Sequence, residues 1–264
     1  MKRIALAALV AVVISTASYA DNSWGTYHWA RNSNPFNLAI VNSTTSDWDG
    51  HVSQAVTYWN LQSVLIMVEE QGNTSTRTRR RCKPPGGKVR ICNLAYGNNG
   101  WLGLAGLSID SAGHIASGYT KLNDTYFAPG SFYDSTAWRQ SVTCQELGHN
   151  VGLSHQDEDF YNTSLSSCMD YQISPYQYPN THDYEQLEVI YAHSDGNSES
   201  DSDGGGGGCN APAGKGCNKG KANGHSGDIG WGMSLGRRGQ TEFFMRIDPD
   251  GTRHITYVTW VEGH

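Results

Sequence analysis

The sequence predicts a mixed α/β (α+β) fold, and three observations support this prediction. Short apolar runs of strand length recur between residues 36 and 122. Longer segments with apolar side chains at helical spacing interrupt those runs and follow them. Near the C-terminus, the Asp-Pro-Asp-Gly sequence at residues 248–251 separates two more strand-like runs and predicts a hairpin.

The individual elements follow from local patterns. Strands are expected at residues 36–41, 64–68, 88–94, 101–109 and 114–122. Helices are expected at residues 51–61, after a turn at 46–50, and at 136–151 and 181–193. Asp134 or Ser135 caps the second helix, and Asp183 and Glu185 favour the first turn of the third. Since isolated hairpins are marginal in water, the strands at 241–247 and 255–261 should dock on the main domain or pair with strands upstream.

Residues 1–20 are typical of a signal peptide. Lys2 and Arg3 precede a short apolar run, and Ser18 and Ala20 are small residues at the positions that a signal peptidase reads. Cleavage after Ala20 predicts a secreted protein, either extracellular or periplasmic. No later segment is long and apolar enough for a membrane anchor, so no membrane partner is expected.

The mature chain divides by composition into three parts. Residues 21–194 are long enough for one domain with a sizeable core. Residues 195–224 are rich in Gly, Ser and Asp and predict a flexible linker that contains a small disulfide loop. Residues 225–264 contain the terminal hairpin.

The six cysteines of an exported chain are candidates for disulfides. Sequence alone leaves the pairing open, and the simplest arrangement is sequential: Cys82–Cys92, Cys144–Cys168 and Cys209–Cys217. Closing a loop as long as the middle one stabilises a fold by about 3 kcal/mol.

The net charge of −6 argues against nucleic acid as a partner. A basic cluster is present and is interpreted as a solvated loop between strands; it contains Arg77, Arg79, Arg80, Arg81 and Lys83. A monomer is expected.

The most informative segment is residues 144–155, which read Cys-Gln-Glu-Leu-Gly-His-Asn-Val-Gly-Leu-Ser-His. Residues four apart share a helix face, so Gln145 and His149 can point at one ion. Glu146 can then reach a water bound to that ion. Gly152 can adopt the left-handed conformation that ends a helix, which lets His155 return as a third ligand. The spacing therefore predicts a metal site.

This segment resembles the extended zinc signature of metzincin-clan metallopeptidases, H-E-x-x-H-x-x-G-x-x-H, with Gln145 in the place of the first histidine. Further stretches carry the resemblance, at residues 97–105, 123–127, 155–160, 167–171 and 182–184. The chain is similar to a bacterial secreted branch of matrixin- and reprolysin-like enzymes in which the motif begins with Gln-Glu. The resemblance implies a mixed five-stranded sheet with three long helices, and a cleft floored by a methionine turn at Met169.

The resemblance also implies an activity, that of a secreted zinc endopeptidase. Gln145, His149 and His155 would bind Zn²⁺, and Glu146 would act as general base and then general acid. Tyr171 stands where some metzincins place a tyrosine that steadies the oxyanion, although a packed core tyrosine is an equal alternative. The strand around residues 102–109 would form the edge of the cleft and pair with an extended protein or peptide substrate.

Gln145 leaves three interpretations open. An amide oxygen is a weaker zinc ligand than imidazole, yet it is neutral and has a similar reach, so direct ligation is possible. Asp157 is an alternative ligand in an acidic loop. A site that holds metal poorly would indicate an inactive module that binds protein or glycan. The remaining histidines lack metal-binding spacing: His28, His51, His114, His182, His193, His225, His254 and His264.

Overall fold

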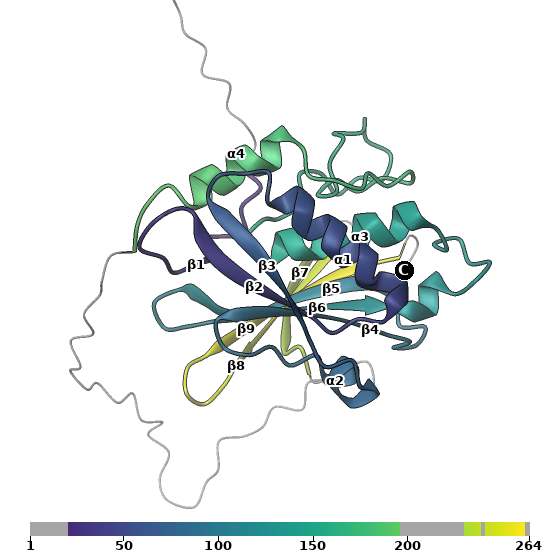
Figure 1. Ribbon diagram of the computed structural model, residues 1–264, viewed down its shortest axis with the longest axis horizontal. Helices are drawn as coiled ribbons and strands as arrows, with labels where there is room; N and C mark the ends of the chain where they lie inside the picture. Colours follow the sequence, from purple (N-terminus) through teal and green to yellow (C-terminus); the bar gives the residue numbers. More distant parts are fainter. Residues whose placement is uncertain (1–20, 196–229, 239–240, 262–264) are drawn as a thin grey trace, which may run out of the picture.

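The structure is a computed structural model that describes residues 21–195, 230–238 and 241–261 (Figure 1). Three predictions lie outside the described residues. These are the signal peptide at residues 1–20, nearly all of the linker at 195–224, and the Cys209–Cys217 disulfide.

The strands and helices alternate irregularly along the chain. The strands are β1 (His28–Trp29), β2 (Phe36–Asn42), β3 (Leu65–Gln71), β4 (Lys88–Leu94), β5 (Trp101–Ile109), β6 (His114–Asn123), β7 (Met233–Arg238), β8 (Thr241–Ile247) and β9 (Arg253–Trp260). The helices are α1 (Ser46–Trp59), α2 (Thr76–Arg81), the 3-10 helix η1 (Asp124–Phe127), α3 (Thr136–His149) and α4 (Thr181–Ile190).

The strands form one mixed sheet of nine strands, in the order β3-β2-β4-β6-β5-β9-β8-β7, with β1 paired to β6 off this path. Strands β3, β2, β4 and β6 are parallel, whereas β5, β9, β8 and β7 follow in antiparallel order. The predicted mixed α/β class is confirmed. The sheet exceeds the expected five strands because β1 and three C-terminal strands join it, one of which, β7, the sequence did not indicate.

Helices α1, α3 and α4 cover one side of the sheet, and α2 lies on the other side (Figure 1). Helix α3 is buried along residues 140–149, and Leu147 is completely enclosed. Helix α1 packs on it through Trp59, whose indole Nε1–H donates to the carbonyl of Cys144 at 3.0 Å. The helix that carries the predicted ligands is therefore fixed between the sheet and α1.

Two local predictions were wrong. The segment at residues 46–50 is the first turn of α1 rather than a loop, because Trp48 is buried in the core and Asp47 and Asp49 complement the helix dipole. The arginines of the basic cluster lie on the short helix α2 rather than on a loop, although most of the cluster is exposed to solvent as predicted. Ser75 caps this helix by accepting from the backbone N–H of Thr78.

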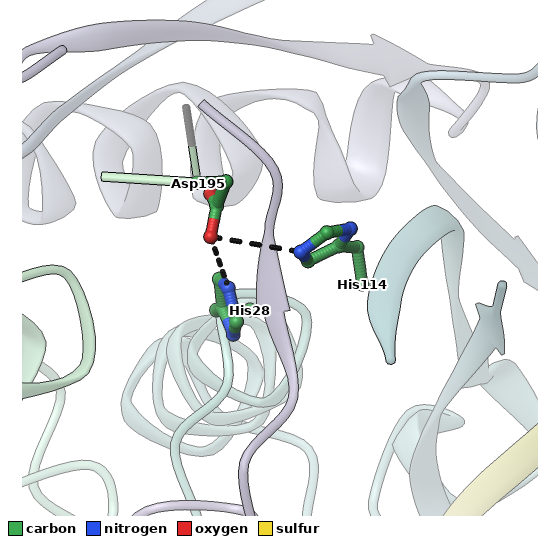
Figure 2. A group of neighbouring side chains, drawn as sticks. All are labelled: His28, His114 and Asp195. Atoms are coloured by element: carbon green, nitrogen blue, oxygen red, sulfur yellow. Dashed lines mark hydrogen bonds and ion pairs between the residues drawn. The ribbon is translucent and has the colours of Figure 1, made fainter. Parts of the chain in front are cut away.

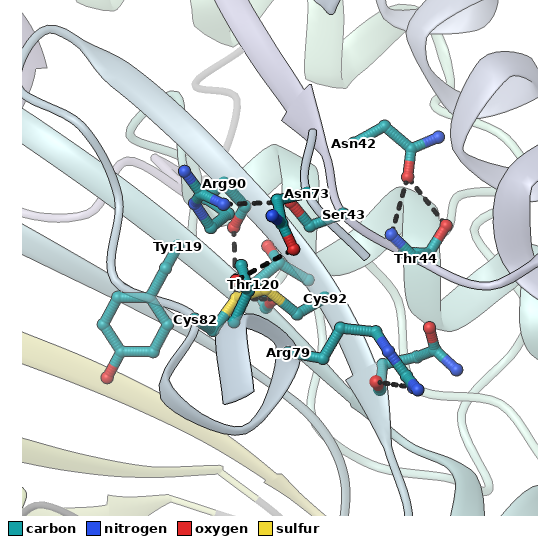
Figure 3. Close-up of a disulfide and its surroundings, with 12 residues drawn as sticks. Asn42, Ser43, Thr44, Asn73, Arg79, Cys82, Arg90, Cys92, Tyr119 and Thr120 are labelled. Carbon is teal, nitrogen blue, oxygen red and sulfur yellow. Dashed lines mark hydrogen bonds between the residues drawn. A yellow bond between two sulfur atoms is a disulfide. The ribbon is translucent and has the colours of Figure 1, made fainter. Parts of the chain in front are cut away.

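A disulfide ties the end of α2 to the sheet (Figure 3). Cys82 ends the helix with a left-handed φ of 46° and bonds to Cys92 of β4. From the same helix, the Arg79 guanidinium donates to the carbonyl of Asn93 at 2.8 Å. The predicted Cys82–Cys92 pair therefore holds the basic helix against β4.

Strand β5 is not an edge strand, which contradicts the expectation for residues 102–109. It pairs with β6 on one side and with β9 on the other, in register from Gly103 opposite Thr259 to Ile109 opposite Arg253. The reason is the C-terminal hairpin, which buries Ile255 and Tyr257 in the main core and Val258 in a second, smaller cluster. None of the described helices combines the length and apolar character that crossing a bilayer requires.

Candidate metal centre

The end of α3 and the turn after it bring His149 and His155 together. Their Nε2 atoms lie 3.1 Å apart and face each other. The turn depends on Gly152, which has a φ of +97° and a position where a Cβ would lie 2.5 Å from the carbonyl oxygen of Tyr27. Only glycine fits this backbone, so the spacing from His149 to His155 has the structural basis that the sequence predicted.

The outer hydrogen bonds of the two imidazoles allow a tautomer in which both facing nitrogens can bind a cation. His149 Nδ1 donates to the carbonyl of Leu153 at 2.8 Å, and His155 Nδ1 lies 3.0 Å from Thr241 Oγ1. His155 Nδ1 also lies 3.4 Å from the carboxylate of Glu158. With the proton of each ring on Nδ1, both Nε2 atoms present lone pairs. Two imidazoles on one tetrahedral zinc ion place their nitrogens about 3.3 Å apart, so this pair fits zinc.

The surroundings keep both rings uncharged. Burial lowers the pKa of His149, and the neighbouring His155 lowers it further. Burial also lowers the pKa of His155 to about 3. Neutral imidazole is the form that binds a metal ion, so the burial of this pair favours ligation.

Gln145 lies one helical turn before His149 and is buried. Its side-chain oxygen lies 3.4 Å from the hydroxyl oxygen of Thr259, which lies closer to Glu146, at 3.0 Å. Gln145 and His149 are four residues apart on one helix and therefore share a face. Ligation by Gln145 stays a prediction.

Glu146 is completely buried, and within the described part of the chain only one of its two carboxylate oxygens accepts a hydrogen bond. Thr259 Oγ1 donates to Oε1 at 3.0 Å, whereas Oε2 has no hydrogen-bond partner among the described residues. Burial raises the pKa of Glu146 to about 8, and the bond from Thr259 opposes this rise. The sequence did not indicate that Gly103 of β5 is part of this site. A Cβ at Gly103 would lie 2.7 Å from Glu146 Oε1. Gly103 thus makes room for the carboxylate.

Met169 lies directly beneath the ligand helix. Its Sδ atom lies 2.6 Å from the position of a Cβ on Gly148, and its carbonyl accepts from the backbone N–H of Gln156 at 2.7 Å. The neighbouring Cys168 is bonded to Cys144 of α3, as predicted. The disulfide and the methionine therefore join the turn to the helix from two adjacent positions.

Tyr171 packs against His155, and its hydroxyl is already hydrogen-bonded within the protein. Its ring centroid lies 4.4 Å from that of His155 and 5.0 Å from that of Phe160. The hydroxyl is hydrogen-bonded to Thr241 Oγ1 at 2.7 Å. Burial raises the pKa of Tyr171 well above its usual value. An oxyanion role for Tyr171 therefore depends on removal of Thr241.

The acidic loop contributes Glu158, rather than Asp157, to the surroundings of His155. The Asp157 carboxylate accepts from the backbone N–H of Asp159 at 2.8 Å and thereby caps its own turn. The Glu158 carboxylate approaches His155 on the Nδ1 side, away from the facing nitrogens. A carboxylate in this place orients the imidazole and raises its basicity as a ligand.

The C-terminal hairpin covers the centre. Tyr257 stacks on His149, Thr259 contacts Glu146, and Thr241 contacts His155. A small cavity of about 20 Å³ remains beside them; its lining includes Leu102, Trp138, Gln145, Tyr171, Thr259 and Trp260. A peptide therefore cannot reach Glu146 while β8 and β9 hold these positions.

A comparison with protein families and one with curated proteins found no match for the chain. Among solved structures, the chain is similar to high choriolytic enzyme 1, a hatching enzyme zinc-protease from Oryzias latipes. The identity is 11%, the alignment covers 62% of this chain and 94% of that one, and the TM-score is 0.36. It is also similar to archaemetzincin from Archaeoglobus fulgidus in complex with malonate, at 14% identity, 58% and 99% coverage and a TM-score of 0.31. Both scores are below 0.5, so neither protein carries a functional conclusion for this chain.

A second group of histidines was missed by the sequence analysis. His28, His114 and Asp195 offer ligand atoms within 4.8 Å of one another, and His193 lies next to them. No local spacing indicates this group, because His28 and His193 are 165 residues apart.

Proposed function

We propose that the chain is a secreted zinc-dependent endopeptidase. The observation that supports this most directly is the buried pair of His149 and His155, whose Nε2 atoms lie 3.1 Å apart. The same helix carries the buried Glu146, one of whose carboxylate oxygens has no hydrogen-bond partner among the described residues. Gln145 would complete the ligand set. The zinc ion would polarise the scissile carbonyl and lower the pKa of its bound water.

Glu146 is the group of this chain that would move protons. Its Oε2 atom is free to accept a proton from the attacking water, and the acid so formed would donate that proton to the departing amine. Thr259 holds the other oxygen and fixes the orientation of the carboxylate. In the family that the motif resembles, Tyr171 would steady the oxyanion.

The position of β9 supports a proposal for how substrate binds. It lies antiparallel to β5 and immediately over Glu146, where an extended peptide would pair with the β5 backbone. We infer that β9 occupies the substrate position and that the structure represents a closed, latent state. The substrate would be a protein or peptide in extended conformation.

The disulfides Cys82–Cys92 and Cys144–Cys168 support an oxidising location outside the cytoplasm. Together with the signal-like residues 1–20, they support secretion, either to the periplasm or to the extracellular space. We further propose a monomer that engages neither nucleic acid nor a membrane.

The test of the activity uses the mature protein and two variants, Glu146→Ala and Gln145→Ala. Bound zinc and hydrolysis of unfolded casein are measured for each. We expect chelator-sensitive cleavage by the parent that is limited by opening of the hairpin, no cleavage but retained zinc in Glu146→Ala, and loss of the zinc ion of this centre in Gln145→Ala. Cleavage that survives both substitutions would contradict the mechanism.

An inactive module that binds protein or glycan is the second candidate, and the covered site favours it. A reversible lock separates the two candidates. Ser108 and His254 lie directly opposite each other on the antiparallel strands β5 and β9, so cysteines at both positions can form a disulfide. Latency predicts no cleavage when the lock is oxidised and cleavage when it is reduced. Bound zinc without cleavage in either state would favour the inactive module.

A further inference from the structure

Four side chains from distant parts of the sequence meet at one end of the molecule. His28 belongs to β1, His114 is the first residue of β6, and His193 and Asp195 follow α4. Figure 2 shows His28 and His114 approaching the same oxygen of Asp195 from different elements. None of these residues belongs to the segment at residues 144–155 that resembles a zinc signature.

The distances between the four side chains are short enough for all of them to contact one bound ion. Asp195 Oδ1 lies 3.0 Å from His28 Nε2, 3.3 Å from His193 Nε2 and 3.5 Å from His114 Nε2. The Nε2 atoms of His28 and His193 are 3.1 Å apart. Three imidazoles therefore direct the same ring atom toward one carboxylate oxygen.

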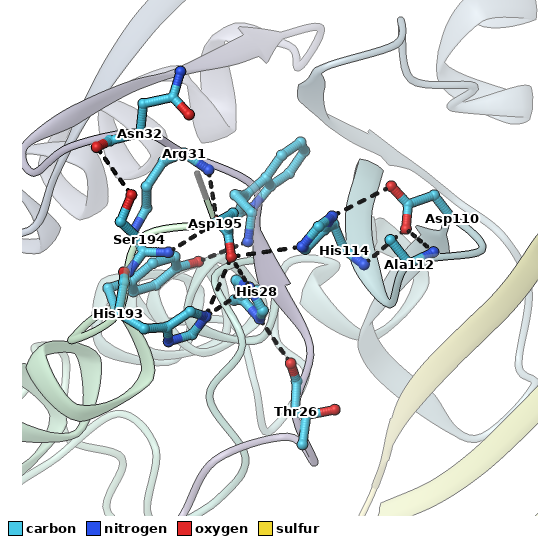
Figure 4. Close-up of polar contacts among 12 residues, drawn as sticks. Thr26, His28, Arg31, Asn32, Asp110, Ala112, His114, His193, Ser194 and Asp195 are labelled. Atoms are coloured by element: carbon cyan, nitrogen blue, oxygen red, sulfur yellow. Dashed lines mark hydrogen bonds and ion pairs between the residues drawn. The ribbon is translucent and has the colours of Figure 1, made fainter. Parts of the chain in front are cut away.

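Outer partners hold three of the four groups, His28, His114 and Asp195, in this orientation (Figure 4). His28 Nδ1 donates to the carbonyl of Thr26 at 2.8 Å, and His114 Nδ1 lies 3.6 Å from the Asp110 carboxylate. Arg31 binds the other oxygen of Asp195, through its backbone N–H at 2.8 Å and its guanidinium at 3.1 Å. Such partners are typical of metal-binding histidines, since they place the proton on Nδ1 and leave Nε2 free.

Two kinds of cation can join these groups. His28 Nε2 lies within hydrogen-bonding distance of Asp195 Oδ1, so a proton can connect them. In the tautomer with the proton on Nδ1, His28 instead presents a lone pair at Nε2, next to the carboxylate oxygen and the Nε2 atom of His193. A metal ion placed between these atoms would bind all of their lone pairs at once.

We propose that His28, His114, His193 and Asp195 bind one divalent cation of the zinc class. Three imidazoles and one carboxylate match the ligand types and the number of a closed tetrahedral site, which leaves no position for a catalytic water. The side chains of His28, His114 and Asp195 are mostly buried, whereas that of His193 is 54% exposed and lets the ion enter from solvent. The ion would tie the N-terminal segment to the segment after α4.

The test isolates this site from the proposed catalytic one. In a His149→Ala/His155→Ala background, equilibrium dialysis against Zn²⁺ followed by mass-spectrometric metal analysis is expected to find about one ion per chain. Adding His193→Ala or His114→Ala should abolish that binding. His193 is the safer variant for folding, because its side chain is half exposed. Circular dichroism confirms that each variant is folded.

His254→Ala is the matched control. His254 also contacts a carboxylate, that of Asp248 at 2.7 Å, but it belongs to the hairpin rather than to this group. Its loss should leave zinc binding unchanged. A folded background variant that binds no zinc, or zinc binding that survives both His193→Ala and His114→Ala, would overturn the proposal. When His149 and His155 are both present, His193→Ala or His114→Ala should lower bound zinc from about two ions per chain to about one. If only the proposed catalytic site fails to bind zinc, the ion at His193 should still be found.

Discussion

Tyr257 lies flat against His149, with ring centroids 4.4 Å apart and planes inclined by only 6°. The side chain of Trp24 contacts Tyr257 as well, with centroids 3.7 Å apart and planes at 78°. Three rings thus connect the N-terminal segment, the ligand helix and the last strand. Any movement of β9 therefore changes the packing around a proposed metal ligand.

Tyr257→Ala should destabilise the fold and loosen the hairpin. Removal of a buried aromatic side chain costs about 3 kcal/mol, which chemical denaturation measures. If β9 blocks the substrate position, casein hydrolysis at a temperature where the variant is folded should rise. Tyr257→Phe is the control, since it removes only the hydroxyl that donates to Ser154 Oγ at 3.1 Å. Equal activity in all three proteins would contradict latency.

Gly148→Ala should distort the centre from within the helix. The added Cβ would lie 2.6 Å from Met169 Sδ and 2.8 Å from Trp59 Cζ2, so one of them must move. Overpacking of this kind costs about 1–3 kcal/mol, and we expect weaker zinc binding as well. At Gly50 in α1 a Cβ meets nothing within 4 Å. Gly50→Ala should therefore stabilise the protein by about 0.5–1 kcal/mol. A stable Gly148→Ala with normal zinc affinity would argue against this packing.

The two disulfides should differ in their effect on metal binding. Replacement of Cys144 and Cys168 by alanine should cost about 3 kcal/mol and weaken zinc binding, because that bond joins α3 to the methionine turn. Replacement of Cys82 and Cys92 should lower stability without changing zinc affinity, since that bond joins α2 to β4. Isothermal titration with Zn²⁺ and thermal unfolding separate the two effects. The same zinc affinity in both variants would contradict the assignment.

Asp183→Ala should uncouple α4 from the methionine turn. The buried carboxylate accepts from Ser167 Oγ at 2.5 Å, from Gln156 Nε2 at 2.7 Å and from the backbone N–H of Asn180 at 2.8 Å. Loss of these bonds leaves buried donors unpaired and should cost about 2 kcal/mol in urea unfolding. Glu185→Ala, at an exposed position of the same helix, should change stability by less than about 0.5 kcal/mol. Similar losses in both variants would show that Asp183 has no special role.

Local pattern was enough to predict strands β2 to β6 of the sheet and helix α3. Strands β4 and β5 begin and end at the predicted residues, and α3 begins at Thr136. These elements depend on apolar spacing and on capping, both of which act within a few residues. The approach of His149 to His155 was predictable for the same reason, since one helix and one glycine turn determine it.

The remaining features depend on long-range pairing that no local pattern encodes. The position of β9 beside β5 follows from packing of Ile255 and Tyr257 into a core formed by earlier segments. The histidine group around Asp195 follows from contacts across most of the chain. The start of α1 was missed because burial of Trp48 outweighs the turn preference of its neighbours.

The position of β9 also has a consequence for assembly. Before this strand arrives, β5 exposes a row of unpaired N–H and C=O groups that any matching strand can satisfy. The β9 of another molecule offers the same register, so reciprocal exchange gives a dimer without new contacts. Refolding at high protein concentration should therefore yield exchanged dimers, which size-exclusion chromatography resolves, and dilution before refolding should prevent them.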